Sequence, residues 1–422
     1  MSARTGVLCA LRGPAEAAAA RGIDADPLLE MTRRCADLPE VLAAAAGGAG
    51  SVVVLSTDLP GLDRDAVQDL RACGARTLVV PAEGWSVARA EALDADAVVP
   101  PGDPALTVPT AVRELLTRRR DGGRHAPDGA RPVPVPGTST RAPAPASAPT
   151  GRVVAVWGPT GAPGRTTLAV NLAAELAELA DRRWSTLLVD ADTYGGTVAQ
   201  HLGLLDEAPG IAAAARAGGT GRLDPVALAA LSPMLPGGLR VLTGMSRASR
   251  WPELPAASLE AVWAAARGLA AWTVVDCGFC LEEDEALSYD TRAPRRNAAT
   301  LSALGAADVV VVVGAGDPVG MQRLVRGIAD LSELGLRGTR LVVVNRVRAS
   351  ASGSHPRDAV REALRRYAGT DARVVVEDQP ACDGALLRAL TLAEHAPSSP
   401  VRRAIAGLAT ELLSLEVVAG AH

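Results

Sequence analysis

The fold is decided by the stretch WGPTGAPGRTT at residues 157–167. The apolar run VVAV at residues 153–156 precedes it, and a helical pattern starting at Leu168 follows it. In this strand–loop–helix setting, backbone N–H groups and a helix N-terminus can hold phosphate groups. Gly161 and Gly164 permit unusual backbone angles and a close approach of the backbone to a phosphate. We therefore expect a nucleotide-binding α/β domain.

This loop lacks the lysine of the strict GxxxxGK[ST] motif. Arg165 stands in the lysine position, and because the chain contains no lysine, all 43 of its basic residues are arginines. Thr166 offers a hydroxyl that could ligate Mg²⁺, and Thr167 begins the helix. Arginine keeps the positive charge, but its planar fork is not equivalent to a lysine point charge. The loop predicts nucleotide binding with weak or absent hydrolysis.

Two later apolar runs end in acidic residues. Residues 187–189 lead into Asp190 and Asp192, and residues 272–275 lead into Asp276. One carboxylate of the first pair could belong to a metal shell, and the other could orient an attacking water. A lone aspartate at a strand end is more often a turn or cap residue, but the upstream loop favours the catalytic interpretation.

Bulk properties limit the classes of function. The chain has 422 residues, which is enough for two or three domains, and its net charge is −4. With no global basic field and only 2% aromatic residues, nucleic acid is not an expected partner. Six scattered cysteines, no secretory signal and no apolar run of about 18 residues predict a cytoplasmic protein.

Residues 1–117 are predicted to form an α/β domain with a parallel sheet. The expected strands lie at residues 6–11, 51–55, 77–80 and 97–99, and helical patterns such as 38–46 and 66–72 lie between them. The order resembles a response-regulator receiver, a flavodoxin-like fold. However, Ser56 stands where a receiver has its phosphorylated aspartate, and Asp58 is expected to be a turn residue. The resemblance implies a pseudo-receiver used for docking or dimerisation.

Residues 118–150 are rich in proline and alanine, which predicts a disordered linker. Residues 151–422 are predicted to form a second α/β domain, whose parallel or mixed sheet carries helices on both faces. Its expected strands lie at residues 153–156, 186–189, 240–242, 272–275, 309–313, 341–344 and 373–376.

An amphipathic segment at residues 401–415 is expected to pack on the core, with membrane attachment as the less favoured alternative.

Together these residues resemble the MinD/ParA superfamily of deviant-Walker ATPases, over about residues 153–413. The resemblance implies ATP and Mg²⁺ as cofactors. It assigns catalysis to Asp192 and Arg165, the metal shell to Thr166, Asp190 and Asp276, and nucleotide binding to Gly161, Ala162, Gly164, Arg165, Thr166, Thr167 and Asn345, the last reading the base.

The chain departs from the family pattern at the loop. Thr160 replaces the signature lysine, which in the family reaches across a dimer to the partner's phosphates, and Ala162 replaces a glycine. Pro163 removes one N–H donor. An arginine from the cluster Arg292, Arg295 and Arg296 could stand in for the lysine, although a solvated loop is the simpler interpretation.

A pseudo-receiver joined to such a domain is similar to the CpaE/TadZ group of Flp/Tad pilus assembly and to actinobacterial septum-site-determining proteins. The resemblance implies a homodimeric scaffold or regulator of localisation, with pilus-secretion or cell-division proteins as partners. The alternative is an active ATPase switch with ATP-dependent dimerisation and slow hydrolysis through Asp192. DNA partitioning would need a basic surface, and the acidic net charge argues against it.

Overall fold

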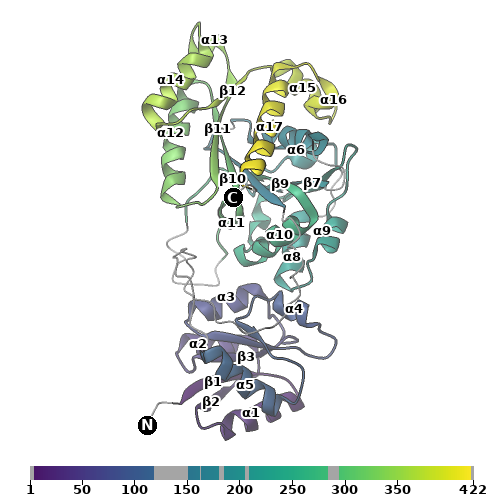
Figure 1. The fold of residues 1–422 in the computed structure, drawn as a ribbon, viewed down its shortest axis with the longest axis vertical. Coiled ribbons are helices and arrows are strands. Elements are labelled where there is room, and N and C mark those ends of the chain that lie inside the picture. The colour runs from purple at the N-terminus through teal and green to yellow at the C-terminus, as the bar shows by residue number, and fades with distance from the viewer. Residues whose placement is uncertain are drawn as a thin grey trace, which may run out of the picture. The chain divides into compact units, whose positions relative to one another are not determined.

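The computed structural model describes residues 4–117, 151–161, 163–179, 185–204, 209–283 and 294–419 (Figure 1). The chain divides into two compact units, and each is built around one sheet in which every strand pairing is parallel. The predicted linker at residues 118–150 and the loop residue Ala162 lie outside the described residues.

The five-stranded sheet has the order β2-β1-β3-β4-β5, which is the flavodoxin-like order. Its strands are β1 (Thr5–Ala10), β2 (Leu29–Arg34), β3 (Val52–Ser56), β4 (Arg76–Val80) and β5 (Ala97–Val98). The intervening and following helices are α1 (Pro14–Ala25), α2 (Leu38–Ala46), α3 (Arg64–Ala72), α4 (Val87–Glu91) and α5 (Pro104–Thr117). The four predicted strands are confirmed. Strand β2 was not predicted, because this edge strand is polar and only Leu29 is buried in it.

Strand β3 ends in an uncharged residue, Ser56. Ser56 is buried there, and its hydroxyl donates a hydrogen bond to Asp58. The chain then turns, with the N–H of Leu59 donating to the carbonyl of Ser56 and Gly61 at a φ of +81°. Asp58 is therefore held in a turn by its neighbour, as its position in the sequence predicts.

The seven-stranded sheet has the order β12-β11-β10-β6-β9-β7-β8 and is wholly parallel rather than mixed. Its strands are β6 (Arg152–Trp157), β7 (Ser185–Ala191), β8 (Leu239–Leu242), β9 (Ala270–Cys277), β10 (Val309–Ala315), β11 (Thr339–Val347) and β12 (Arg373–Val376). All seven predicted strands are confirmed. The helical elements of this unit are α6 (Arg165–Leu179), α7 (Val198–His201), α8 (Gly210–Gly219), α9 (Pro225–Leu231), the 3-10 turn η1 (Ala248–Glu253), α10 (Ala256–Leu269), α11 (Ala298–Ala306), α12 (Pro318–Glu333), α13 (Ala349–Ser352), α14 (Pro356–Ala368), α15 (Gln379–Leu387), α16 (Leu392–His395) and α17 (Pro400–Ala419).

Strand β6 is buried on both faces. Val154 and Val156 belong to the core on the side of α6 and α17, whereas Val153 and Ala155 belong to the core on the side of α8, α10 and α12. Because side chains alternate along a strand, the continuous apolar run fills both cores at once. This double burial fixes the strand from which the glycine-rich loop leaves the sheet.

Helix α17 packs on the second core. Its apolar stripe, Ile405, Leu408 and Leu412, is buried with α6 side chains, as a core-packing helix requires. Arg402 donates to the carboxylate of Glu175 on α6 at 2.7 Å, and only 4% of that glutamate side chain is exposed. None of the helices in the described ranges is long and apolar enough to cross a membrane.

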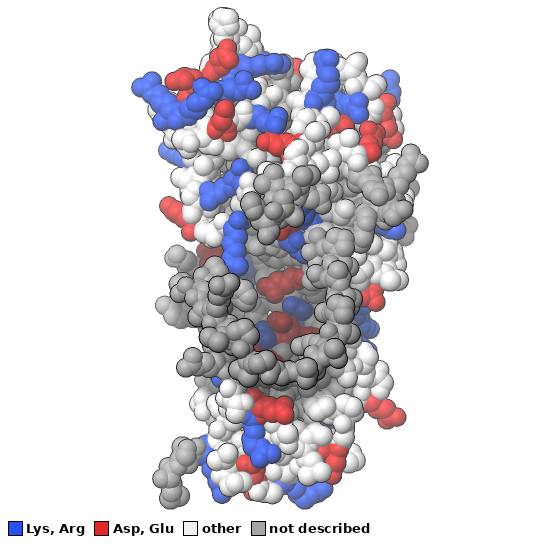
Figure 2. All heavy atoms as spheres, in the orientation of Figure 1, with Lys and Arg blue, Asp and Glu red and all other residues white. Residues whose placement is uncertain are grey.

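Arginine side chains gather at the end of the second unit that carries α13 and α14 (Figure 2). Helix α14 contributes Arg357, Arg361, Arg365 and Arg366, but it also carries Asp358 and Glu362. Arg365 lies 3.9 Å from Glu362 and 3.7 Å from Asp371. Acidic side chains thus interrupt the basic field of this surface.

Replacing Arg402 by alanine should destabilise the second unit, because it leaves Glu175 as a buried carboxylate without its main partner. We expect Arg402→Ala to lower the free energy of unfolding by about 2 kcal/mol in urea denaturation at neutral pH. Arg403→Ala removes the exposed neighbouring arginine and should change it by less than about 0.5 kcal/mol. Equal urea midpoints for the two variants would show that the buried pair contributes nothing.

Candidate functional site

The glycine-rich loop joins β6, which lies between β10 and β9 in the sheet, to helix α6. Gly161 and Gly164 have φ angles of +106° and +94°, which side-chain-bearing residues rarely adopt. A Cβ on Gly164 would lie 2.3 Å from the amide nitrogen of Asn345. The loop can follow its path only with glycine at this position.

Arg165 is turned into its own loop. One guanidinium nitrogen, Nη1, donates to the carbonyls of Gly158 at 3.0 Å and Pro159 at 3.2 Å. The other, Nη2, lies 3.5 Å from a carboxylate oxygen of Asp192. Only 12% of the Arg165 side chain and 9% of the Asp192 side chain are exposed. The arginine therefore ties the loop to the acid that was expected to position water.

Asp190 and Asp276 are neighbours across β7 and β9, where they stand opposite each other in the strand register. The carboxylate of Asp190 accepts from the N–H groups of Asp192 at 3.2 Å and Val198 at 3.1 Å. Burial raises the pKa of Asp190 to about 7, although the Val198 hydrogen bond offsets part of the rise. The protonated form of this acid is thus accessible near neutral pH.

Asp276 is fully buried, and neither of its carboxylate oxygens has a hydrogen-bond partner among the described residues. Burial, followed by the charge of Asp190, raises the pKa of Asp276 well above its usual range. The hydroxyl of Thr166 favours the charged form of Asp276 without meeting hydrogen-bond geometry. Orphaned buried oxygens of this kind are costly unless a ligand or proton satisfies them.

These donors fit Mg²⁺ delivered with a nucleotide. Carboxylate and hydroxyl oxygens are the ligands that Mg²⁺ prefers, and the ion usually keeps waters and binds substrate phosphates as well. Within the part of the chain that the structure describes, no group of three or more His, Cys, Asp or Glu side chains could hold a metal ion. Thr166, Asp190 and Asp276 would hold the ion together with phosphates, and the ion would neutralise phosphate charge.

The loop after Asp192 is braced by residues that follow β9. Asp192 accepts from the N–H groups of Tyr194 at 2.9 Å and Gly195 at 3.3 Å. The Tyr194 hydroxyl donates to Asn297 at 2.8 Å, and its ring lies 4.8 Å from the ring of Phe279. A movement of Asp192 would therefore displace Tyr194 and, through it, Phe279 and Asn297.

Arg296 belongs to the same brace. Its guanidinium donates to the hydroxyl of Thr193 at 2.6 Å and to the carbonyl of Thr193 at 3.0 Å, and it stacks on the Tyr194 ring at 3.8 Å. These contacts occupy Arg296 within its own unit, which argues against it as a substitute for the signature lysine. Arg295 is exposed, and Arg292 lies outside the described residues.

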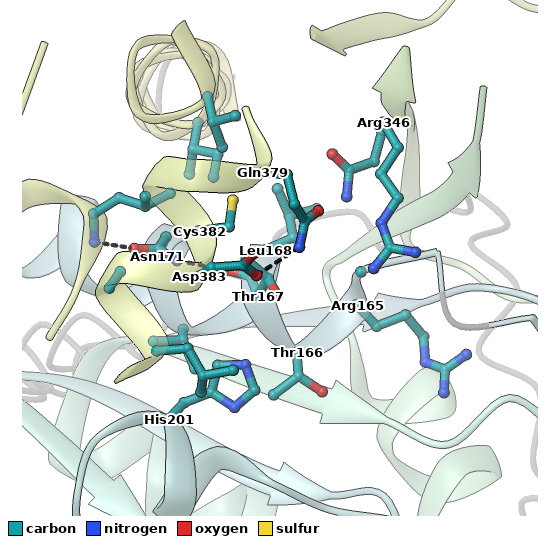
Figure 3. Close-up of a pocket in the computed structure, with 18 of the residues that line it drawn as sticks. Arg165, Thr166, Thr167, Leu168, Asn171, His201, Arg346, Gln379, Cys382 and Asp383 are labelled. Carbon is teal, nitrogen blue, oxygen red and sulfur yellow. Dashed lines mark hydrogen bonds between the residues drawn. The ribbon is translucent and has the colours of Figure 1, made fainter. Parts of the chain in front are cut away.

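A cavity of about 390 Å³ opens beside the loop, between the start of α6, the end of β11 and helices α15 to α17 (Figure 3). Figure 3 shows Arg165 and Arg346 on one side of this cavity and Asn171, Cys382 and Asp383 on the other. The amide nitrogen of Asn345 donates to the Pro163 carbonyl at 2.8 Å, which leaves its carbonyl oxygen to accept from a base. The cavity has a volume typical of small-ligand sites.

Arg346 reaches this cavity because the backbone of β11 is irregular there. The pairing of β11 with β12 shifts register between Val344 and Val347, and Arg346 adopts a left-handed φ of +54°. Such irregularities re-aim side chains and concentrate at functional sites. The side chain lies at the cavity, on the Arg165 side (Figure 3).

The structure brings most of the predicted site residues together. One cavity is lined by Gly164, Arg165, Thr166, Thr167, Asp192 and Asn345. Asp190 and Asp276 are buried at the adjacent strand ends, and Gly161 lies at the loop tip outside the cavity lining. The roles of Tyr194 and Asn297 could not be predicted from the sequence, because no motif connects their side chains to Asp192 across the fold.

No family model and no curated protein matches this chain in sequence. Solved structures do match it. A ParA family ATPase from Chlorobium tepidum TLS superposes with a TM-score of 0.52 at 17% identity, covering 63% of this chain and 100% of that protein. The chain shares the fold of this ParA family ATPase over that part of its length.

Two MinD structures give similar values. The cell division ATPase MinD of Pyrococcus furiosus has a TM-score of 0.49 at 20% identity, covering 63% of this chain and 99% of its own. The septum site-determining protein MinD of Pyrococcus horikoshii, complexed with Mg-ADP, has a TM-score of 0.49 at 19% identity, covering 64% of this chain and 98% of its own. At such identities the similarity concerns the fold alone.

The nucleotide-free chain should lose stability as the pH rises from about 5 to about 7.5, because folding raises the pKa of Asp190 from 3.8 to about 7. In this interval the folded chain binds the proton more tightly than the unfolded chain, so stability is greatest at the lower pH. Asp190→Asn removes the titrating group and keeps an acceptor for Val198. Its thermal midpoint should vary less over the interval.

Asp371→Asn is the matched control. The N–H of Ala372 lowers the pKa of this exposed aspartate, so Asp371 titrates below the interval and its replacement should preserve the wild-type slope. An Asp190→Asn slope identical to that of the wild type would contradict the assignment of the titration to Asp190.

Proposed function

We propose that this protein is a regulatory or localisation scaffold of the MinD/ParA type, which binds ATP weakly and hydrolyses it very slowly or not at all. The observation that carries the proposal is the contact of Arg165 with Asp192. Arg165, which stands at the lysine position, donates hydrogen bonds to two loop carbonyls and forms an ion pair with Asp192, the acid that would position water. A carboxylate held by a guanidinium is a poor partner for an attacking water.

Nucleotide binding requires less of the loop than hydrolysis does. The N-terminus of α6, the loop N–H groups and the 390 Å³ cavity supply the phosphate and base contacts without a lysine. Pro163 removes one donor from the loop, and Thr160 adds no charge at its tip. These features support retained but weakened affinity for ATP and Mg²⁺.

The biological setting follows from the resemblance to CpaE/TadZ and septum-site-determining proteins. The proposal comprises a pseudo-receiver at residues 1–117, a linker at residues 118–150, a nucleotide-binding domain at residues 151–422 and a cytoplasmic homodimer. The flavodoxin-like strand order and the neutral Ser56 support the pseudo-receiver assignment. Pilus ATPase and membrane-platform genes beside this gene would favour a pilus partner over a cell-division partner.

The alternative function is an active ATPase switch. In that case Arg165 would leave Asp192 when phosphates arrive, and dimerisation would depend on ATP. The two functions share a binding site and differ in turnover, so the kinetics of two variants separate them.

The test measures ATP binding by calorimetry and phosphate release on the full chain with Mg²⁺. We expect micromolar affinity and turnover at the detection limit. Arg165→Lys removes the guanidinium fork from Asp192 and supplies a point charge, so turnover should rise by about a hundredfold. Arg152→Lys, a matched change at the far end of β6, should leave turnover unchanged.

Two outcomes would contradict the proposal of a scaffold that binds ATP. Wild-type turnover that Asp192→Ala abolishes would establish the active switch instead. No binding of ATP or ADP at millimolar concentration would remove nucleotide from the function altogether.

A further inference from the structure

A second hollow lies beside the tip of the glycine-rich loop. It has a volume of about 660 Å³ and is formed by Pro159 and Thr160 of the loop, residues 279–282 and helix α12. The guanidinium of Arg323, from the first half of α12, lies here with one nitrogen 3.5 Å from the Thr160 carbonyl. A Cβ on Gly161 would lie 2.2 Å from the same guanidinium nitrogen, so Arg323 rests directly on the loop tip.

A close approach of α12 to β6 puts Arg323 in this position. A Cβ on Gly327 would lie 2.9 Å from the ring of Trp157, the last residue of β6, and 3.5 Å from Pro159. Residues four apart share one face of a helix, so Arg323 lies one turn before Gly327 on the side that meets the loop. Leu324 is fully buried and anchors this turn of the helix in the core.

Arg323 brings a positive charge to this hollow. The side chain is exposed and makes no ion pair with any carboxylate in the described ranges. Arg165, by contrast, is tied to Asp192. Arg165 is thus an inward cation that is already paired. Arg323 is an outward cation, and the hollow around it is also lined by Glu282, Asp330 and Glu333, none of which forms an ion pair with it.

The order of groups along the site indicates which anion Arg323 would bind. A nucleotide with its base at Asn345 would run its phosphates past Gly164 and Thr166 toward the Arg165–Asp192 pair. The last phosphate of a triphosphate would come nearest to the loop tip, whereas a diphosphate would stop short of it. Arginine suits this contact because its several N–H donors match phosphate oxygens.

We propose that Arg323 is a second phosphate-binding residue of this loop, which contacts the terminal phosphate of a nucleoside triphosphate and makes the chain prefer ATP to ADP. The proposal rests on the nucleotide binding put forward above. In this proposal Arg323 of α12 supplies the positive charge at the loop tip, because Thr160 is uncharged.

The test compares ATP and ADP affinities of the full chain by calorimetry with Mg²⁺, at low and at high salt. Arg323→Ala should weaken ATP binding by about tenfold and ADP binding by less than about twofold. Arg326→Ala is the matched control, because this exposed arginine lines the same hollow three residues later and makes no hydrogen bond to the described part of the loop. Arg323→Lys, which keeps the charge, should recover part of the ATP affinity.

The outcomes separate this proposal from the one it rests on. If the wild type binds neither nucleotide, both proposals fail. If the wild type binds ATP but Arg323→Ala weakens ATP and ADP equally, or weakens neither, only the role of Arg323 is overturned. An equal loss of ATP preference in Arg326→Ala would overturn it too, since general positive charge in the hollow would then explain the effect. Thermal melts of both arginine variants serve as the check that they fold.

Discussion

The site depends on the burial of parallel strands in one sheet. Strand β6 lies between β9 and β10 with both faces in apolar cores, so its end cannot shift without opening one core. Parallel strands all end at the same edge of the sheet, which is where the loop, Asp190 and Asp276 meet. Hydrophobic packing thus fixes the positions of the polar site residues, although the packed side chains take no part in the chemistry.

Placing acids at that edge has an electrostatic cost. Asp276 has no hydrogen-bond partner among the described residues, and Asp190 beside it is buried as well. A bound Mg²⁺–nucleotide would satisfy these oxygens, and in its absence protonation lowers the cost. The arrangement would couple ligand binding to the protonation and charge of the strand ends.

Three arginines lie in or near the glycine-rich loop, and each has different contacts. Arg165 braces the loop from inside and holds Asp192, while Arg296 clamps the segment after that acid. Arg323 stands outside, on the loop tip. Because the guanidinium has several donors in a fixed plane, Arg165 and Arg296 each bridge more than one group. Arg165 therefore holds the loop against Asp192 from the inside.

The sequence by itself determined the two α/β units, the strands of the larger sheet and most of the residues around the cavity. Apolar runs buried on both faces and glycines before a helix are local signals, and each can be read from a few neighbouring residues. The sequence did not reveal β2, whose polar side chains suit a sheet edge, or the inward turn of Arg165. Only the tertiary structure decided that Arg323, more than 150 residues after the loop, lies on its tip. That contact depends on how closely α12 approaches Trp157 at Gly327, and such helix-to-strand distances follow from packing across the whole core rather than from local sequence.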